Sequence, residues 1–256
     1  MITRRKFLRT LPPAVLSAGS LVTSSVLAQQ KALRFGYFDK FEPLSFRDAD
    51  GMMGGLLIDA VSLVSSVAGI SVSHAGLPWI RAQKYVQKGE LDAFCTNPTD
   101  SRREYVQFCE NPLVVNRNGA LHRKGDKRFG EYQKKTDMKG VNLADYLGNK
   151  WIEAEMGDVV SFTWLSSQSE VLGVVARGRS DGVIVSEIEG MHLLKTIGMD
   201  SDLEFSALPF MPQDNYTIGV RRSYEGVDEV VSKLNAAVLR TMEDGRLRKI
   251  VSHYLS

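Results

Sequence analysis

The chain has 256 residues, which is enough for one large domain or two modest ones. Its 43% hydrophobic and 24% charged residues are typical of a globular protein rather than a disordered one. The net charge of +2 depends on four basic residues among the first 28; without them, 28 basic residues face 30 acidic ones, which argues against nucleic acid as a partner.

Residues 1–28 are predicted to be a cleaved export signal. A basic start is followed by an apolar stretch over residues 11–27, and Ala28 ends a small-residue cleavage site. The sequence TRRKFL at 3–8 resembles a twin-arginine signal, with an ordinary secretion signal as the alternative. The apolar stretch is short and rich in Ser, Thr and Pro, which disfavours a membrane anchor. We therefore expect a periplasmic protein.

The next segments alternate between strand and helix patterns. Residues 33–38 alternate as a strand, and residues 39–46 form the loop at its carboxyl end. Residues 48–51 are predicted to be a hairpin tip. Residues 55–68 carry an apolar helical stripe, and residues 70–73 form the next strand.

A second helix and strand follow. Pro78 suits a first helical turn, the apolar residues through position 88 share one face, and Gly89 is a fitting stop. Residues 91–95 are predicted to be a short buried strand. Strands that alternate with helices favour parallel strands covered by helices on both faces.

A polar turn lies at the carboxyl end of the strand 91–95, the edge at which open α/β sheets bind ligands. Thr96, Asn97 and Thr99 offer hydroxyl and amide groups there. Arg102 offers a fixed fork of donors that matches a carboxylate. The turn therefore predicts an anion site, with a solvated surface arginine as the alternative.

Cys95 and Cys109, the only cysteines, both lie at the ends of predicted strands. An oxidising compartment permits a disulfide between them, and two buried free thiols are the alternative. The four histidines are scattered and show no metal-ligand spacing. We expect no metal and no cofactor.

The second half of the chain repeats the alternation. Residues 108–123 form an extended run, and the strongly charged segment 125–139 is predicted to be a solvated surface loop. The further predicted elements are strand 141–146, helix 150–156, strand 159–165, helix 169–177, strand 216–222 and helices 227–242 and 247–254.

A short internal repeat connects the two halves. The sequence VQKGELDA at 86–93 is echoed by VARGRSDG at 175–182, 89 residues later. Each copy ends a helix, turns at a glycine and enters a strand, and the spacing is too long for a solenoid. We interpret the copies as the same unit in two lobes. Residues 178–182 also match G-x-S-x-G, but the hydrolase elbow needs a strand before it and a helix after it, so we reject that reading.

Three motifs, in this combination and order, resemble the bacterial extracellular solute-binding proteins of family 3, the polar amino-acid binders of ABC importers. They are Gly89-Glu90-Leu91-Asp92-Ala93, Thr99-Asp100-Ser101-Arg102 and Phe108-Cys109-Glu110-Asn111-Pro112. The resemblance covers nearly the whole mature chain. It implies a type II periplasmic binding protein fold, in which two α/β lobes with mixed sheets are joined by two crossover strands.

The resemblance also implies a domain division. Residues 29–112 and 221–256 would form a discontinuous first lobe, and residues 113–220 would form the second. The chain would cross between lobes within residues 108–123 and return near 216–222.

Further site residues follow from the family pattern. The loop after the first strand would contribute Asp39, Phe41 and Glu42, with core packing as the alternative for Phe41. In the family a Gly-Thr-Thr-like turn at a helix start binds the ligand carboxylate. This chain has Gly148 and Asn149 there instead.

Ser186 occupies the place of an aspartate that pairs with the ligand ammonium in amino-acid binders of the family. A hydroxyl cannot replace a buried anion that faces a cation. Either Glu187 or Glu189 serves instead, or the ligand lacks an α-ammonium. Ser186 would then cap the ligand from the second lobe.

The implied function is capture of a small polar, carboxylate-bearing ligand by a monomer that delivers it to the membrane permease of an ABC importer, without catalysis. One alternative is a periplasmic enzyme on the same scaffold, similar to cyclohexadienyl dehydratase, with Glu42, Ser186 and Glu187 as proton-transfer candidates. Another is a soluble partner that presents ligand to a membrane sensor.

Overall fold

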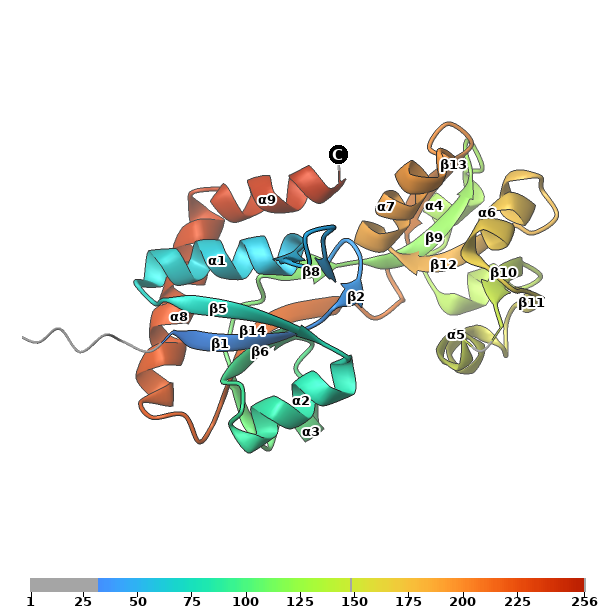
Figure 1. Ribbon diagram of the computed structural model, residues 1–256. Coiled ribbons are helices and arrows are strands. Elements are labelled where there is room, and N and C mark those ends of the chain that lie inside the picture. Colours follow the sequence, from blue (N-terminus) through green and yellow to red (C-terminus); the bar gives the residue numbers. More distant parts are fainter. Residues whose placement is uncertain (1–31, 148, 256) are drawn as a thin grey trace, which may run out of the picture. The chain divides into compact units, whose positions relative to one another are not determined.

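The computed structural model describes residues 32–147 and 149–255 (Figure 1). The export signal expected at residues 1–28 lies outside this part of the chain. Among the described residues, none of the helices combines the length and the apolar character that a bilayer crossing requires.

The described residues form two large mixed sheets, one small three-stranded sheet and the helices between them. In chain order the elements are β1 Leu33–Phe38, β2 Lys40–Phe41, β3 Ser45–Arg47, β4 Met53–Gly54, α1 Leu56–Ala68, β5 Val72–Leu77, α2 Trp79–Lys88, β6 Ala93–Thr96, α3 Asp100–Arg103, β7 Val106–Phe108, β8 Val114–Asn116, β9 Asn118–Arg123, α4 Arg128–Glu131, the 3₁₀-helix η1 Lys135–Met138, β10 Asn142–Tyr146, α5 Lys150–Met156, β11 Ser161–Leu165, α6 Gln168–Ala176, β12 Gly182–Ser186, α7 Glu187–Ile197, β13 Leu203–Ala207, β14 Asp214–Arg221, α8 Val227–Glu243 and α9 Arg246–Leu255.

The first sheet has the strand order β5-β1-β6-β14-β7, with β8 also paired to β14. β1 runs parallel to β5 and β6, whereas β14 runs antiparallel to β6 and β7. Apolar side chains of α1 and α8 cover one face, where Phe35 and Ile218 are fully buried. α2 covers the opposite face around Phe94 (Figure 1). Helices therefore cover both faces of the first sheet, as the alternation of strands and helices in the sequence predicted.

The second sheet has the order β11-β10-β12-β9-β13 and repeats the strand directions of the first. β10 runs parallel to β11 and β12, and β9 runs antiparallel to β12 and β13. Its two faces carry separate apolar clusters, one around Leu143 and Ile152 and one around Leu172 and Leu194. Each sheet therefore has a core of its own.

The internal repeat corresponds to the same local structure in both sheets. The Asp92 carboxylate accepts the backbone N–H of Arg34 (3.1 Å), and the N–H of Asp92 donates to the carbonyl of Arg34 (2.8 Å). The Asp181 carboxylate accepts the N–H of Asn142 (2.8 Å), and the N–H of Asp181 donates to the carbonyl of Asn142 (2.7 Å). In each sheet the aspartate thus fixes the start of the neighbouring parallel strand.

The chain passes between the two sheets twice. It leaves the first sheet at Arg117, between β8 and β9, and returns through residues 208–213 between β13 and β14. β8 pairs with the start of β14, and Thr217–Val220 of β14 pair with β6. Sheet pairing therefore places β8 and all of β14 in the first sheet, whereas the sequence assigned residues 113–220 to the second lobe.

The charged segment 125–139 is more ordered than the sequence predicted. It contains α4 and η1, and Phe129 and Met138 are fully buried in the second sheet's core. The Phe129 ring stacks on His122 with the centroids 4.6 Å apart. The prediction of a solvated loop was wrong for these two side chains, because isolated apolar residues among many charges give no periodic signal.

Cys95 and Cys109 are buried free thiols in the structure. Cys95 on β6 is the register partner of Ile218, and the N–H of Cys109 donates to the Ile218 carbonyl on the other side of β14 (2.9 Å). Two strand spacings separate their Cα atoms by about 10 Å, whereas a disulfide spans at most about 7 Å. The sheet thus favours the free-thiol alternative.

Candidate functional site

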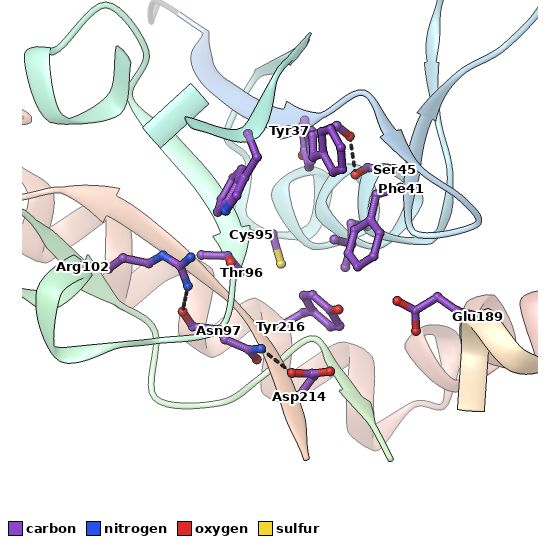
Figure 2. Close-up of a pocket in the computed structure, with 13 residues that line it drawn as sticks. Tyr37, Phe41, Ser45, Cys95, Thr96, Asn97, Arg102, Glu189, Asp214 and Tyr216 are labelled. Carbon is purple, nitrogen blue, oxygen red and sulfur yellow. Dashed lines mark hydrogen bonds between the residues drawn. The ribbon is translucent and has the colours of Figure 1, made fainter. Parts of the chain in front are cut away.

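A cavity of about 350 Å³ lies at the carboxyl ends of β1 and β6 (Figure 2). This is the edge at which open α/β sheets bind ligands. Most lining residues come from the first sheet and its loops, and one comes from α7. The lining residues are Tyr37, Phe38, Phe41, Ser45, Leu57, Trp79, Cys95, Thr96, Asn97, Arg102, Glu189, Asp214 and Tyr216.

Aromatic rings form much of the cavity wall. The Phe38 and Phe41 centroids lie 6.2 Å apart, and Phe41 meets Tyr216 edge-on at 6.4 Å. The buried Tyr37 hydroxyl forms a hydrogen bond with Nδ1 of His74 (3.0 Å). Such a wall suits the aliphatic part of a ligand or a cation.

Arg102 is half-buried and fixed at the cavity. Its Nη1 donates to the Asn97 carbonyl (2.8 Å), and its Nε donates to Oε1 of Gln83 (3.2 Å). The guanidinium lies over the Trp79 ring, 5.3 Å from the centroid. Burial lowers the pKa of Arg102. In the described part of the chain, no carboxylate lies within 4.0 Å of this guanidinium, so its charge lacks an anionic partner.

The side chain of Asn97 connects β6 to β14. Its Nδ2 donates to Oδ1 of Asp214 (2.5 Å), and its Oδ1 accepts the backbone N–H of Asn215 (2.5 Å). The amide that the sequence assigned to the ligand therefore orients a second cavity residue, Asp214. Thr96 is buried beside it and also lines the cavity.

Glu189 lines the cavity from the first turn of α7. Its Oε2 accepts a hydrogen bond from Nδ2 of Asn116 (2.9 Å), and Oδ1 of Asn116 accepts the N–H of Ile188 (3.1 Å). Burial, aided by the nearby charge of Asp214, raises the pKa of Glu189 to about 7 although the Asn116 hydrogen bond lowers it. This carboxyl group therefore changes charge near neutral pH.

A comparison with known proteins identifies the family to which this fold belongs. The family model for bacterial extracellular solute-binding proteins, family 3, matches residues 33–256. The chain belongs to this family. Its fold is the type II periplasmic binding protein fold, as the sequence motifs implied.

Individual relatives of this solute-binding protein are distant. The L-cystine-binding protein TcyA of Bacillus subtilis is 20% identical over 88% of this chain and 81% of its own length. The L-cystine solute receptor of Neisseria gonorrhoeae, in its unliganded open conformation, has a TM-score of 0.73 at 17% identity, over 89% and 93% of the two chains. Substrate-binding domain 2 of Lactococcus lactis GlnP has a TM-score of 0.70 at 16% identity, over 89% and 96%.

Some of the predicted site residues of this solute-binding protein lie together. Phe41, Thr96, Asn97 and Arg102 all line the cavity. Arg102 lies on α3, which follows β6, as expected for a polar group near the carboxyl end of that strand. Phe41, which was expected from the family resemblance, lies on β2, which follows β1.

Other predicted residues in the first sheet's loops have different partners. Asp39 lies 3.5 Å from the Arg47 guanidinium, and Glu42 lies 3.8 Å from Nε2 of His192. Thr99 precedes α3, and its hydroxyl forms a hydrogen bond with Ser101 (3.1 Å). None of Asp39, Glu42 and Thr99 lines the cavity.

Asn149 and Ser186, which were predicted to contact the ligand from the second lobe, also lie outside the cavity lining. Asn149 precedes α5, and its Nδ2 donates to Asp145 (3.1 Å). Ser186 immediately precedes α7, and Glu187 pairs with the exposed Arg117. Gly148 lies outside the described residues. Of the two glutamates considered as replacements for the family aspartate, Glu189 is the one at the cavity.

The sequence analysis did not identify Asp214 and Tyr216, which line the cavity, as site residues. Both lie at the amino end of β14, which runs antiparallel beside β6. An antiparallel strand brings its amino end to the edge where its parallel neighbours have their carboxyl ends. An acidic residue just before the predicted strand at 216–222 was the available signal.

Proposed function

We propose that the protein captures a small polar ligand with a carboxylate group, an amino acid or a related compound, in this cavity. The observation that carries the proposal is the half-buried Arg102 guanidinium, which is fixed by Asn97, Gln83 and Trp79 and lacks a carboxylate partner among the described residues. Buried charges in proteins are ordinarily paired. A ligand carboxylate would supply the missing partner in bidentate geometry.

Delivery to the permease of an ABC importer, from the periplasm, is the proposed physiological role. The family's extracellular character and the export signal expected at residues 1–28 support it. TcyA, one of the relatives, is an L-cystine-binding protein, which favours an amino-acid ligand. Capture and release need no catalysis, so we propose a binding protein that acts as a monomer.

We further propose that binding closes two lobes around the ligand. The first lobe would comprise residues 32–116 and 214–255, and the second would comprise residues 118–207. The two chain passages, at Arg117 and at residues 208–213, would act as the hinge. Ligand would favour the closed state because only that state places groups of both lobes against it.

A thermal-shift screen of amino acids, opines, polyamines and small carboxylates tests this function, because a ligand that binds only the native state raises its stability. Hits with the wild type should bind Arg102→Ala roughly 30-fold more weakly, since removing one partner of a buried charged pair costs about 2 kcal/mol or more. Arg102→Lys should be intermediate because lysine lacks the planar fork.

Arg103→Ala is the matched control. Arg103 is the next residue on α3, is exposed and stacks on Phe108 outside the cavity. This variant should bind like the wild type. Unchanged affinity in Arg102→Ala would refute the role of the guanidinium, and a screen without any carboxylate hit would refute the ligand class.

A further inference from the structure

The two cysteines of the chain lie on either side of one strand. β14 separates β6 from β7 in the first sheet, and Cys95 on β6 is the register partner of Ile218 on β14. Cys109, directly after β7, donates its N–H to the carbonyl of the same Ile218 (2.9 Å). Both cysteines belong to the apolar cluster on the face that α1 and α8 cover. One strand therefore separates two thiols that share a core.

A disulfide between these cysteines is incompatible with β14 in its native place. Their Cα atoms lie about 10 Å apart, two strand spacings, whereas a disulfide joins Cα atoms at most about 7 Å apart. β14 pairs with β6 through Thr217–Val220 and with β7 through Gly219–Arg221. Bringing the cysteines together would break both sets of strand hydrogen bonds. The disulfide and the native first sheet therefore exclude each other.

Displacement of β14 would also remove part of the binding cavity. Asp214 and Tyr216 line the cavity from this strand, and Ile218 and Val220 are fully buried in the core. Cys95 also lines the cavity (Figure 2). The redox state of the two thiols therefore affects the site as well as the stability of the sheet.

The fold protects both thiols from oxidation. Each cysteine is only 5% exposed. Burial raises the pKa of the Cys109 thiol to about 12, and it raises the pKa of the Cys95 thiol as well. The thiolate is the species that attacks a disulfide, and little of it is present in the folded protein at neutral pH.

The unfolded chain lacks this protection. Thirteen residues separate Cys95 from Cys109, and a loop of this length closes within roughly 100 ns. Pairing of β14 with β6 instead joins segments about 120 residues apart, and sheets built on such contacts form more slowly. Because disulfide exchange takes seconds or longer, a chain that stays unfolded for that time beside an oxidant would become cross-linked.

We propose that Cys95 and Cys109 form a redox-sensitive switch of folding: the native first sheet forms only while both thiols are reduced, and a disulfide between them holds the chain in a state without β14 in place. The step is a thiol–disulfide exchange with a disulfide oxidant. The two thiols lose two electrons and two protons, their sulfurs form one bond, and the disulfide of the oxidant is reduced to two thiols.

The expected export route agrees with this requirement. The periplasm is an oxidising compartment. Residues 3–8 resemble a twin-arginine signal, and that route carries folded proteins. A chain that folds in the reducing cytoplasm would arrive with β14 already inserted and both thiols buried.

Refolding of the full protein tests the inference. The protein is unfolded in urea and treated at about pH 8 with oxidised dithiothreitol, a cyclic disulfide that leaves no lasting adduct on a single thiol. The monomer without free thiols is then refolded, and its hydrogen exchange is compared with that of the reduced chain. Amides of β6 and β14 should exchange about a hundredfold faster or more in the cross-linked chain, whereas those of β10 and β12 should stay protected. Reduction of the disulfide should restore the native protection.

Cys95→Ala and Cys109→Ala are the matched controls. Each variant keeps one thiol and cannot close the loop, so both should refold after the same treatment as they do without oxidant. Folded wild type should keep both thiols in the same reagent and lose them about a hundredfold more slowly, or more, than the unfolded chain. Titration of free thiols measures this difference.

Native protection of β14 in the cross-linked chain would overturn the inference. So would an unfolded chain that does not form the disulfide, a folded protein that forms it as fast as the unfolded one, or single-cysteine variants that fail to refold only after oxidation. A cross-linked chain that lacks protection in β14 and recovers it on reduction would establish the inference. These measurements involve no ligand, so the inference and the proposed function are tested separately.

Discussion

At the scale of single residues, Glu189 shows how a carboxyl group in the proposed binding site lowers the stability of the ligand-free protein. Its carboxyl group is largely withdrawn from water and has one amide donor, Asn116, but no cation among its described neighbours. Burial raises its pKa from 4.5 to about 7. A group whose pKa is higher in the folded state contributes stability at low pH and loses it as the pH rises through the folded pKa.

Glu189→Gln should therefore stabilise the ligand-free protein above neutral pH. Glutamine keeps an oxygen for the Asn116 donor but cannot ionise, so the variant should exceed the wild type by about 2 kcal/mol at pH 8. The difference should shrink between pH 7 and 4.5 and vanish below that. Urea unfolding at several pH values measures it, and an equal stability at pH 8 would contradict the raised pKa.

Sequence reasoning placed Arg102 near the cavity because it follows a strand whose carboxyl end could be recognised from its pattern, whereas Phe41 was expected from the resemblance to the family. It could not identify Asp214 as a site residue, because that depends on β14 inserting antiparallel beside β6, a pairing of segments about 120 residues apart. The role of Asn97 was equally hidden. Asn97 lines the cavity, but its side-chain amide donates to Asp214, which lies 117 residues away in the sequence.

At the scale of elements, the aspartates of the two repeat copies, Asp92 and Asp181, differ in the burial and number of their arginine partners. The side chain of Asp92 is 4% exposed and accepts hydrogen bonds from Arg34 and Arg221. Burial raises its pKa, but these hydrogen bonds more than compensate and lower it overall. Asp181 pairs with Arg128, whose side chain is 50% exposed and also contacts Asp126.

Asp92→Asn should accordingly destabilise the protein by about 3 kcal/mol, because it leaves two arginines without their buried anion. Asp181→Asn should cost about 1 kcal/mol or less, since its exposed partner retains Asp126 and water. Chemical unfolding of both variants at neutral pH compares them directly. Equal losses of unfolding free energy in the two variants would contradict this prediction. They would show that the hydrogen bonds from each carboxylate to a backbone N–H, which both sites have, matter more than the ion pairs.

Helices with a clean apolar stripe were predicted nearly to the residue. α2 ends at Lys88 and is capped by Gly89, which has a φ of 79°, and α5 spans Lys150–Met156 as the sequence indicated. α7 and β13 were not predicted. α7 mixes buried Ile188 and Leu194 with acidic residues and an internal Gly190, so its stripe is too weak to recognise without the neighbouring strands.

At the scale of the whole molecule, ligand binding and lobe closure should be one event. The cavity lining includes Glu189, which belongs to the proposed second lobe, although most of it comes from the first. Contacts from both lobes to one ligand would couple affinity to closure. The proposed lobe boundaries follow the sheet pairing. They differ from the boundaries expected from the sequence, in which residues 108–123 form one uninterrupted extended run.

Small-angle scattering should therefore show a smaller radius of gyration when a ligand from the screen saturates the protein. Arg102→Ala at the same ligand concentration should remain at the ligand-free value, and Arg103→Ala should contract like the wild type. An unchanged radius in the saturated wild type would contradict closure while leaving binding itself intact.

The place of β14 in the first sheet has a consequence for biogenesis. All strands of the second sheet lie within residues 118–207, so a nascent chain can complete that sheet early. The strand that separates β6 from β7 emerges only with residues 214–221, and until then both neighbours have unpaired edges that invite aggregation. The first sheet, which holds most of the cavity lining, is therefore the last to be completed. A chain that ends before residue 214 would lack β14 and could not form the cavity.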